Sequence, residues 1–501
     1  MVCKLSFIAF PIFLKKQKSM NKRLRYLLLV LIGLSLYLVT VFFDFSYFDD
    51  QDLILTNYPI ISNFQNVGQL FSDDVFLSES NFYYRPILNL SFMIEAQISK
   101  TAPWFYHLAN VIYHLLAVLL LFSLLLNLKV REKKAWYLSL LFLIHPALVS
   151  AVAWIPGRND SLLAVFILSS FLFFIKFIER GGYKDYLWCL LFFIFALLTK
   201  EAAVFLPLLF IFYYLFLTKD RIDKEKIWTL VLGTTLSIFL WFLFRSLVVT
   251  ESLGDIKQIV LTVINYLPVL MVALGKFFLP FNLGIMPQLH ESNLIWGGVS
   301  FLFLLFLLIR KKIKKEYFIF SLLWFTLFLL PGLLNPDPKI SYQILLLEHR
   351  LYLPFVGLII LLSQTELINK RRGKISLIIK STILIFFFTV TLWRLPHFKN
   401  PLSFWQYAVT TSPNSALATR NLGVMYYLSG DNEAAMKNYK RSIEINKDEP
   451  MVYNNLGLIY LENGDLESAE EYFLKELKIN PGYDKAVLNL ELLQDLKNQL
   501  R

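Results

Sequence analysis

The sequence predicts an all-α membrane protein, a polytopic bundle of about 11 transmembrane helices followed by a short α-solenoid. The chain has 501 residues, of which 56% are hydrophobic and 47 are phenylalanine, whereas soluble domains are about 45–50% apolar. This excess is gathered in blocks of about 15–22 residues, the length that crosses a hydrocarbon core. Near the C-terminus a pattern of small and aromatic residues recurs every 34 residues, which is typical of stacked helical repeats.

The charge pattern excludes nucleic acid as a partner and places the chain in a membrane. The net charge is +12, but the basic residues cluster in short loops between apolar blocks, as expected of cytoplasmic loops. Cys3 and Cys189 both lie in apolar segments, so no disulfide framework is available.

The multi-pass domain is predicted to cover residues 20–393, after a possible N-terminal extension at 1–19 that is too short to span comfortably. The predicted spans lie near 26–43, 106–126, 136–149, 160–178, 186–199, 202–217, 228–248, 294–309, 317–333, 351–367 and 375–393. A further apolar block, 260–280, contains Pro268, Gly275 and Lys276. We assign this block to a re-entrant or interfacial helix, because the basic loops on either side require an even number of crossings.

The basic loops also set the predicted orientation. Lys22, Arg23 and Arg25 place the N-terminus in the cytoplasm, and the later loops "KVREKK", "TKDRIDKEK", "RKKIKK" and "NKRRGK" agree. The C-terminal region after residue 393 is then extracytoplasmic. So is the long loop 44–105, which carries eight acidic residues and only Arg85 and Lys100 as bases. The unusual polar groups therefore collect on one membrane face.

Residues 394–501 carry the repeats. Leu422-Gly423, Tyr426, Ala435 and Tyr439 recur as Leu456-Gly457, Tyr460, Ala469 and Phe473, and a half-repeat with Trp405 and Ala408 precedes them. This is the tetratricopeptide pattern, in which small residues let paired helices approach and aromatic residues fill the gap. Two repeats and two halves are close to the lower limit of stability, so we expect the array to lean on the membrane domain. Its concave face suits an acceptor polypeptide or a secretion partner, and homo-oligomerisation is the alternative.

Several strings together resemble one family. They are "FDDQDLILTN" at 48–57, "YRPI" at 84–87, "VAWIPGRNDSL" at 152–162 after "HP", "LLTKEAAVFLP" at 197–207 and "EHRLYLPFVG" at 348–357. With the repeats in the same order, the chain resembles the transmembrane-and-tetratricopeptide-repeat O-mannosyltransferases and their bacterial relatives, which are C-type integral-membrane glycosyltransferases. The resemblance implies transfer of mannose or another hexose from a polyprenyl-phosphate carrier to a hydroxyl. A nucleotide sugar is not expected as the donor, because the sequence contains no glycine-rich phosphate loop. One departure is Ser150, where the family typically has Glu.

The predicted catalytic residues are Asp49 and Asp50, just beyond the first apolar segment. Carboxylates at a membrane edge are costly and commonly functional, and partial burial raises the pKa of a carboxylate that must accept a proton from a hydroxyl. The resemblance implies that the catalytic acid lies in this pair. We predict Asp50 as the base, with Asp49 orienting it or the acceptor. The alternative is that one or both cap the next helix.

The predicted ligands of the donor phosphate are Arg85, Arg158, Lys200 and Arg350. All lie near the outer ends of spans, where Arg can grip phosphate with two parallel bonds and Lys acts as a point charge. For each, the alternatives are snorkelling to the surface or a local ion pair, such as Glu348 with Arg350 or Lys200 with Glu201.

Three further residues, His145, Glu201 and Glu348, are weaker candidates for binding the sugar or the acceptor. His107 and His114 share a helical face without a third ligand at metal spacing, so no zinc site is predicted. No cofactor is required, although a divalent cation that bridges Asp49 or Asp50 to phosphate is compatible with the spacing.

The sequence predicts a multi-pass glycosyltransferase of a bacterial inner membrane that modifies Ser or Thr of exported proteins presented by its repeats. Its other expected partners are the polyprenyl-phosphate-linked sugar and membrane lipid. Two alternatives stay open at this point. One keeps the chemistry but changes the acceptor to a cell-envelope glycan or lipid, and the other is a non-catalytic membrane scaffold that presents the repeats.

Overall fold

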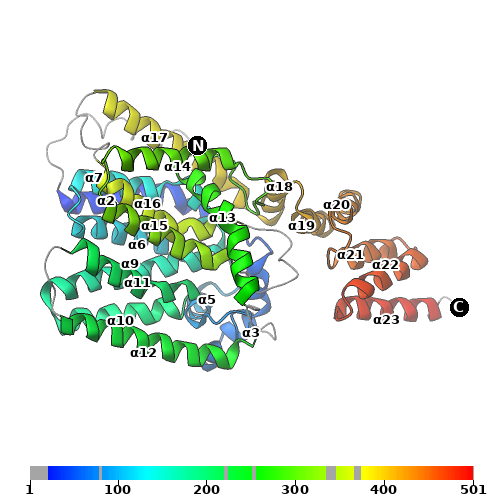
Figure 1. Cartoon of the computed structure of the whole chain (residues 1–501). Coiled ribbons are helices and arrows are strands. Elements are labelled where there is room, and N and C mark those ends of the chain that lie inside the picture. The colour runs from blue at the N-terminus through cyan, green and yellow to red at the C-terminus, as the bar shows by residue number, and fades with distance from the viewer. Residues whose placement is uncertain are drawn as a thin grey trace.

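The computed structural model describes residues 21–77, 82–218, 224–250, 256–333, 346–365 and 374–499. Every regular element in these ranges is a helix, which confirms the all-α fold. Figure 1 shows a bundle of helices running side by side and a chain of shorter helices that projects from one end of it. The predicted extension 1–19 lies outside the described residues.

The bundle contains twelve labelled helices in the described ranges. They are α2 (Lys22–Tyr37), α6 (Trp104–Asn127), α7 (Glu132–Leu143), α9 (Arg158–Arg180), α10 (Tyr183–Leu197), α11 (Leu206–Phe212), α12 (Lys224–Val248), α13 (Ile256–Phe278), α14 (Leu294–Ile309), α15 (Lys315–Leu329), α16 (Tyr352–Gln364) and α17 (Lys374–Arg394).

The membrane character of the bundle is shown, but the predicted count of eleven crossings is not confirmed. Among the described residues, six helical segments are long and apolar enough to cross a membrane, or seven if α7 and Pro146–Ala153, bent by 51°, form one span. Other predicted crossings fall on shorter helices. The 16 residues of α14, for example, rise about 24 Å, less than a hydrocarbon core of about 30 Å. The block 260–280 falls largely within α13, which contains Pro268, and its assignment as re-entrant or interfacial stays a prediction.

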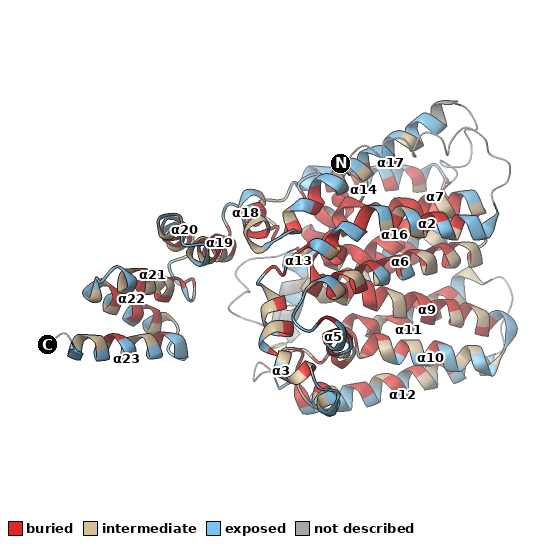
Figure 2. Cartoon of the chain, turned by 180° about the vertical axis from the view of Figure 1, so that it is seen from behind, coloured by how far each residue is buried: buried red, intermediate tan, exposed pale blue. Residues whose placement is uncertain are grey.

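The bundle has central and peripheral helices. Almost every side chain of α16 is buried, whereas α12 exposes Trp228, Leu232 and Phe239, and the view from behind shows this contrast (Figure 2). A Cβ added at Gly357 of α16 would lie 2.8 Å from the carbonyl oxygen of Ser321 in α15, so glycine is needed for this close approach. Apolar side chains on α12 are compatible with lipid, which is as apolar as they are.

The long loop after α2 folds against the end of the bundle that faces the solenoid (Figure 1). It contains η3 (Gln51–Thr56), α3 (Tyr58–Ile61), η4 (Phe64–Gly68), α4 (Gln69–Ser72) and α5 (Pro86–Ser99). Ile54, Leu70 and Phe92 are among the buried residues of a small core that the loop forms with Tyr106 of α6. This apolar core holds the acidic segment at a fixed place beside the bundle.

The C-terminal repeats are confirmed as two helix pairs flanked by two single helices. They are α18 (Pro401–Thr411), α19 (Ala416–Leu428), α20 (Asn432–Ile445), α21 (Val452–Glu462), α22 (Leu466–Ile479) and α23 (Asp484–Gln499). A Cβ added at Gly423 would lie 2.6 Å from the ring of Tyr439, and one at Gly457 would lie 2.6 Å from that of Phe473. Glycine and an aromatic ring therefore fit together in each pair, as the repeat pattern predicts.

Helix α18 attaches the repeats to the membrane domain. The Tyr407 hydroxyl donates to the carbonyl oxygen of Leu283 at 2.8 Å, and the Ser412 hydroxyl donates to that of Met286 at 2.8 Å. Helices α19–α23 extend away from this attachment (Figure 1). The expected support from the membrane domain is thus supplied through α18.

Candidate functional site

The candidate site begins with a tight loop that Asp50 closes. Asp50 is 1% exposed, and its carboxylate accepts hydrogen bonds from the backbone N–H of Ser46 at 2.6 Å and of Phe48 at 2.9 Å. The Ser46 hydroxyl also donates to it, at 2.9 Å and 3.0 Å to the two oxygens. The carboxylate of Asp50 is thus occupied in holding the loop, and its backbone places Asp49 next to it.

Asp49 has the properties expected of a base. It is half-buried, and its carboxylate makes no hydrogen bond or ion pair with another described residue. Burial, together with the neighbouring carboxylates of Asp50 and Asp52, raises the pKa of Asp49 to about 7, against the opposing effect of Arg350 and Arg85. A carboxylate with a pKa near neutral can exchange a proton at ordinary pH.

Arg350 brings an uncompensated positive charge close to Asp49. Its guanidinium donates to the carbonyl oxygen of Gly332, and it forms no ion pair with a described carboxylate. The residue is half-buried and lies in η10 (Glu348–Leu351). Because it keeps its charge while holding only one carbonyl, it can grip an additional anion.

Two ion pairs border this part of the site. Arg85 contacts Glu201 at 2.9 Å, and the Lys200 ammonium lies 2.7 Å from Asp160. Burial lowers the pKa of Lys200 to about 8, although Asp160 acts in the opposite direction. The adjacent pairing of Lys200 with Glu201, considered as an alternative, is not formed in the described part of the chain, because each residue pairs with a partner from another segment.

His349 lies beside Asp160 and was not predicted. Its Nε2 is 3.8 Å from Asp160 Oδ2, and its ring lies 5.1 Å from that of Trp154. Burial and the charges of Lys200 and Arg350 hold the pKa of His349 well below its usual range, so the ring is neutral. A clue existed in the sequence, since His349 stands between two predicted residues and Asp160 lies in the same string as Arg158.

Arg158, by contrast, is committed to holding the fold. It is fully buried, forms an ion pair with Glu95 of α5, and donates to the carbonyl oxygen of Tyr106 at 2.6 Å. Its guanidinium also lies 4.6 Å from the ring centroid of Phe92. These contacts join α5, α6 and α9, and the structure does not bring Arg158 together with Asp49 and Arg350.

Glu348 and His145 are also engaged elsewhere. Glu348 is 1% exposed and contacts Lys276 at 2.7 Å and Arg394 at 2.7 Å, so its considered pairing with Arg350 is replaced by these two. His145 Nδ1 accepts from the backbone N–H of Ala147 at 3.2 Å, and its Nε2 lies 3.1 Å from the carbonyl oxygen of Phe277. Both residues therefore connect segments rather than facing an open site.

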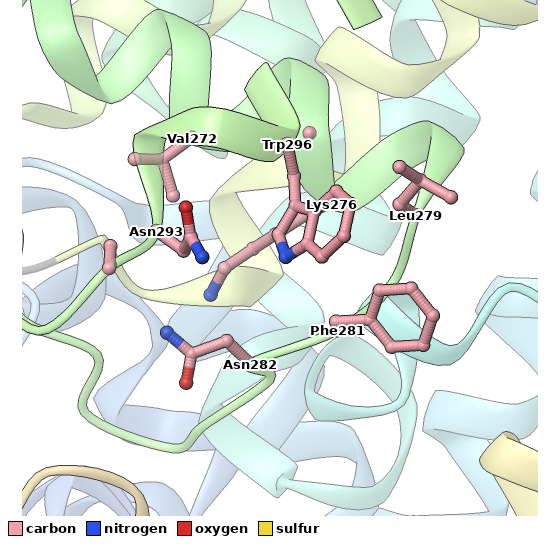
Figure 3. Close-up of a pocket in the computed structure, with 9 residues that line it drawn as sticks. Val272, Lys276, Leu279, Phe281, Asn282, Asn293 and Trp296 are labelled. Atoms are coloured by element: carbon pink, nitrogen blue, oxygen red, sulfur yellow. The ribbon is translucent and has the colours of Figure 1, made fainter. Parts of the chain in front are cut away.

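The pocket beside Lys276 is too small for a sugar. It lies between the end of α13 and the start of α14, with Asn282, Asn293 and Trp296 among its lining residues (Figure 3). Its volume is about 10 Å³, which corresponds to about one water molecule. Lys276 itself is bound to Glu348, so this pocket does not extend the site.

Two tryptophans clamp the loop that carries Asp49. The indole N–H of Trp154 donates to the Ser46 hydroxyl at 3.0 Å, and that of Trp405 donates to the Ser46 carbonyl oxygen at 3.2 Å. The Phe48 ring is stacked on Trp154 at 6.0 Å and meets Trp405 edge-on at 5.3 Å. Because Trp405 belongs to α18, the first helix of the repeat region is part of the framework of the site.

An amide on α6 fixes the segment that carries Trp154. The side chain of Asn110 donates to the carbonyl oxygens of Val152, Trp154 and Ile155 at 3.1–3.3 Å. Ser150, which stands where the resembled family typically has Glu, is buried, and its hydroxyl lacks a hydrogen-bond partner among the described residues. This chain therefore carries a buried hydroxyl at this position in place of a carboxylate.

The described part of the chain contains no group of three His, Cys, Asp or Glu side chains arranged to hold a metal ion. His107 and His114 do not converge. His114 Nδ1 lies 2.6 Å from the Tyr352 hydroxyl, whereas His107 Nε2 lies 3.4 Å from the carbonyl oxygen of Asp44. The expectation that no metal is required stays a prediction.

Comparison with known protein families gives three matches. Residues 86–244 match the family described as dolichyl-phosphate-mannose-protein mannosyltransferase. Residues 423–464 match a TPR repeat family, and residues 450–483 match a tetratricopeptide repeat family. The first match begins at α5, directly after Arg85, and includes Asp160 and Lys200. The other two matches cover the predicted repeats.

Individual relatives give the same result. The chain is 35% identical over 162 residues to protein O-mannosyl-transferase TMTC2 of Homo sapiens, covering 31% of this chain and 19% of that protein. It is 33% identical over 171 residues to protein O-mannosyl-transferase F38B6.6 of Caenorhabditis elegans, covering 32% and 24%. It is 36% identical over 164 residues to protein O-mannosyl-transferase tmtc2 of Xenopus laevis, covering 32% and 19%.

The matched part thus spans about a fifth to a quarter of the length of these relatives. The matches support a glycosyltransferase. The resemblance predicted from the motifs is confirmed: the chain combines a region similar to protein O-mannosyltransferases with tetratricopeptide repeats.

Proposed function

We propose that the protein is an integral-membrane glycosyltransferase that moves a hexose from a polyprenyl-phosphate carrier to Ser or Thr of exported polypeptides. Dolichyl-phosphate-mannose is the first donor to test, because the matched family is described by it. The observation that carries the proposal is the combination of Asp49, an unengaged carboxylate with a pKa of about 7, and Arg350, a guanidinium without a described carboxylate partner.

In the proposed reaction Asp49 accepts the proton of the acceptor hydroxyl. The hydroxyl oxygen forms a bond to the anomeric carbon, while the bond from that carbon to the carrier phosphate oxygen breaks. The bonding electrons leave with the phosphate. Because attack and departure occur on opposite sides of the carbon, the anomeric configuration is inverted. Of the two predicted carboxylates, the hydrogen bonds favour Asp49 as the base and Asp50 as the residue that holds it.

Arg350 is proposed to hold the departing phosphate. A preformed cation near a developing negative charge stabilises the transition state more than the ground state. Arg85 is already paired with Glu201 and Lys200 with Asp160. We therefore assign Arg85 and Lys200 a supporting role, in which their charges contribute to the local electrostatic field while Arg350 contacts the phosphate directly.

The acceptor is proposed to pass between the acidic loop and the solenoid. Lys485 in α23 acts on Asp52 in η3 by lowering its pKa against the larger opposing effect of burial, so the two parts are within electrostatic reach. An extended segment between them would reach Asp49, three residues before Asp52. Short flexible segments of polypeptide fit this passage better than folded domains.

We further propose that the site and the repeats are extracytoplasmic and that the N-terminus is cytoplasmic. The basic loops support this orientation. The relatives compared above are eukaryotic, so the bacterial inner membrane stays a prediction from the sequence alone.

The test is transfer by the purified full-length protein. Dolichyl-phosphate mannose, polyprenyl-phosphate mannose and polyprenyl-phosphate glucose are offered with a panel of Ser- and Thr-containing peptides, and the product is detected by mass spectrometry. Asp49→Asn should reduce transfer by at least 10³-fold, in line with loss of a general base and its field. Full activity of Asp49→Asn would refute the proposed mechanism. A cell-envelope glycan fraction is offered as a second acceptor, and transfer to it but to none of the peptides would refute the proposed acceptor.

Truncation separates the two roles of the repeat region. A chain that ends after Ser415 keeps α18 and the Trp405 contact, so it should still modify short peptides and lose activity on long polypeptides. A chain that ends after Lys399 loses Trp405 and should lose both activities. Equal activity of the two truncated chains on short peptides would contradict a role for α18 in the site.

A further inference from the structure

A second cavity lies between α2, α6 and α9, with a volume of about 400 Å³. The first turn of α2 and the last turns of α6 and α9 meet there, at the end of the bundle away from α18 (Figure 1). Its lining residues come from all three helices and are Lys22, Tyr26, Leu120, Ser123, Leu126, Asn127, Ser169, Leu172, Phe173 and Lys176. The candidate catalytic residues are not among them.

The cavity carries positive charge that the described protein does not neutralise. Lys22 and Lys176 come from different helices, and neither forms an ion pair with a described residue. No acidic side chain is among the lining residues. Two acids at this end of the bundle are already paired, since Glu132 lies 2.9 Å from Arg25 and Glu179 lies 3.5 Å from Lys129.

Lys176 is held in a half-buried position rather than extended into water. It lies in α9, four residues before the helix ends at Arg180, and its ammonium is 4.4 Å from the ring centroid of Phe173. A lysine that only needed solvent would extend past the helix end. The contact with Phe173 instead keeps the charge at the cavity.

The lining is more polar near the helix ends than deeper in the bundle, where Ser169 is the one polar lining residue. Near the helix ends the Asn127 amide donates to the Ser123 carbonyl oxygen at 2.9 Å, and the Tyr26 hydroxyl lies 2.8 Å from the Ser123 hydroxyl. Leu120 and Leu172 lie about one to two turns further into the bundle. From Lys176 to Ser169 the helix rises about 10 Å. A charged headgroup above an acyl chain has this same order of polarity.

We propose that this cavity binds an anionic phospholipid, with its phosphate between Lys22 and Lys176 and an acyl chain along Leu120 and Leu172. Basic pockets between transmembrane helices at a membrane surface suit such headgroups. A soluble phosphate would leave the apolar half of the cavity unused. A zwitterionic lipid would bring its own cation toward two lysines. The proposal is independent of the transfer reaction at the other end of the bundle.

The experiment titrates the purified full-length protein with dioleoyl-phosphatidylglycerol and counts bound lipid by native mass spectrometry. The double variant Lys22→Gln with Lys176→Gln should bind about 30-fold more weakly, which corresponds to about 1 kcal/mol for each lysine at a membrane surface. The matched control is Lys311→Gln with Lys314→Gln, which removes the same charge from a basic loop predicted to lie at the same face. This control should bind lipid as the unchanged protein does.

A second variant tests the cavity without changing its charge. Leu172→Trp fills the apolar half and should also weaken lipid binding, while thermal unfolding confirms that each variant is folded. If both lysine double variants lost lipid affinity equally, general attraction to the basic surface would explain the binding and the proposal would be overturned. Equal affinity for dioleoyl-phosphatidylcholine would also overturn it, because the cavity would then not recognise the headgroup. Displacement of the lipid by millimolar inorganic phosphate alone would assign the site to a soluble anion and would also overturn it.

Discussion

Replacing Asp49 with Asn should abolish transfer and, at the same time, stabilise the protein at alkaline pH. Burial and the neighbouring carboxylates raise the pKa of Asp49 from 3.8 to about 7, so the folded state holds the proton more firmly than the unfolded state. Each pKa unit corresponds to about 1.4 kcal/mol. An ionised Asp49 therefore costs the folded state up to about 4 kcal/mol above pH 7, and partial contact with water reduces this to about 2 kcal/mol.

The expected stabilisation by Asp49→Asn depends on pH. Below about pH 3.8 Asp49 is protonated in both states and the cost is absent; it grows as the pH rises and is complete above about pH 7. Asp49→Asn should thus raise the free energy of unfolding by about 2 kcal/mol at pH 8 and by about half of that at pH 5. In the unchanged protein, the rate of transfer should rise with pH up to about 7, because only ionised Asp49 accepts a proton.

Thermal unfolding in detergent at pH 5 and pH 8 measures the stability difference, and transfer to a peptide measures the activity. Asp73→Asn is the matched control, since Asp73 lies in the same long loop after α2 and its carboxylate accepts from the Gln69 side chain at 2.9 Å. The control should keep its activity. A lower melting temperature for Asp49→Asn at pH 8, or an effect that is equal at both pH values, would refute the reasoning.

Substitutions at four further positions have defined outcomes. Arg350→Gln should lower kcat by about 10²–10³-fold, and Arg350→Lys should recover part of the loss, as measured by single-turnover transfer. Trp405→Phe removes one hydrogen bond to Ser46, worth about 1 kcal/mol, and should lower kcat about fivefold with an unchanged KM for the donor. Glu348→Gln leaves two buried cations short of a counter-charge and should destabilise the protein by about 3–5 kcal/mol, seen as a reduced yield of folded protein. Gly457→Ala forces apart a tightly packed helix pair at a cost of about 1–3 kcal/mol, so the repeats should melt earlier while transfer to short peptides is kept.

The fold was predictable where sequence patterns are strong. The repeat period and the pairing of Gly457 with Phe473 follow from the sequence because each repeat is a local unit that packs on its neighbours. The number of crossings was not predictable to the same degree. Hydrophobicity identifies apolar blocks in the sequence. Some of these blocks form helices, such as α11 and α14, that are shorter than a membrane span.

The candidate site follows from the sequence in the segment that it marks, but not in the contacts that each side chain makes. The string around Asp49 and Asp50 marks the acidic loop, yet only the turn of the backbone shows that Asp50 accepts from Ser46 and Phe48. The ion-pair partners could not be predicted from the sequence either. Arg85 pairs with Glu201, 116 residues away, whereas reasoning from the sequence favours neighbours. Trp405 was expected only as a repeat residue, because nothing local shows that α18 reaches Ser46.

Whether an ion already has a partner distinguishes the roles of the predicted residues. Removing the partner of a buried ion costs about 3–5 kcal/mol, so Arg158 and Glu348, which are held by buried partners, cannot be diverted to a substrate without weakening the fold. Among the described residues Arg350 donates only to the carbonyl oxygen of Gly332, so it is free to bind a phosphate in the proposed reaction. The two aspartates follow the same rule, and each depends on the other. Asp50 is committed to the loop, and its fixed negative charge is one of the causes that raise the pKa of Asp49, so the carboxylate that holds the loop also prepares its neighbour to accept a proton.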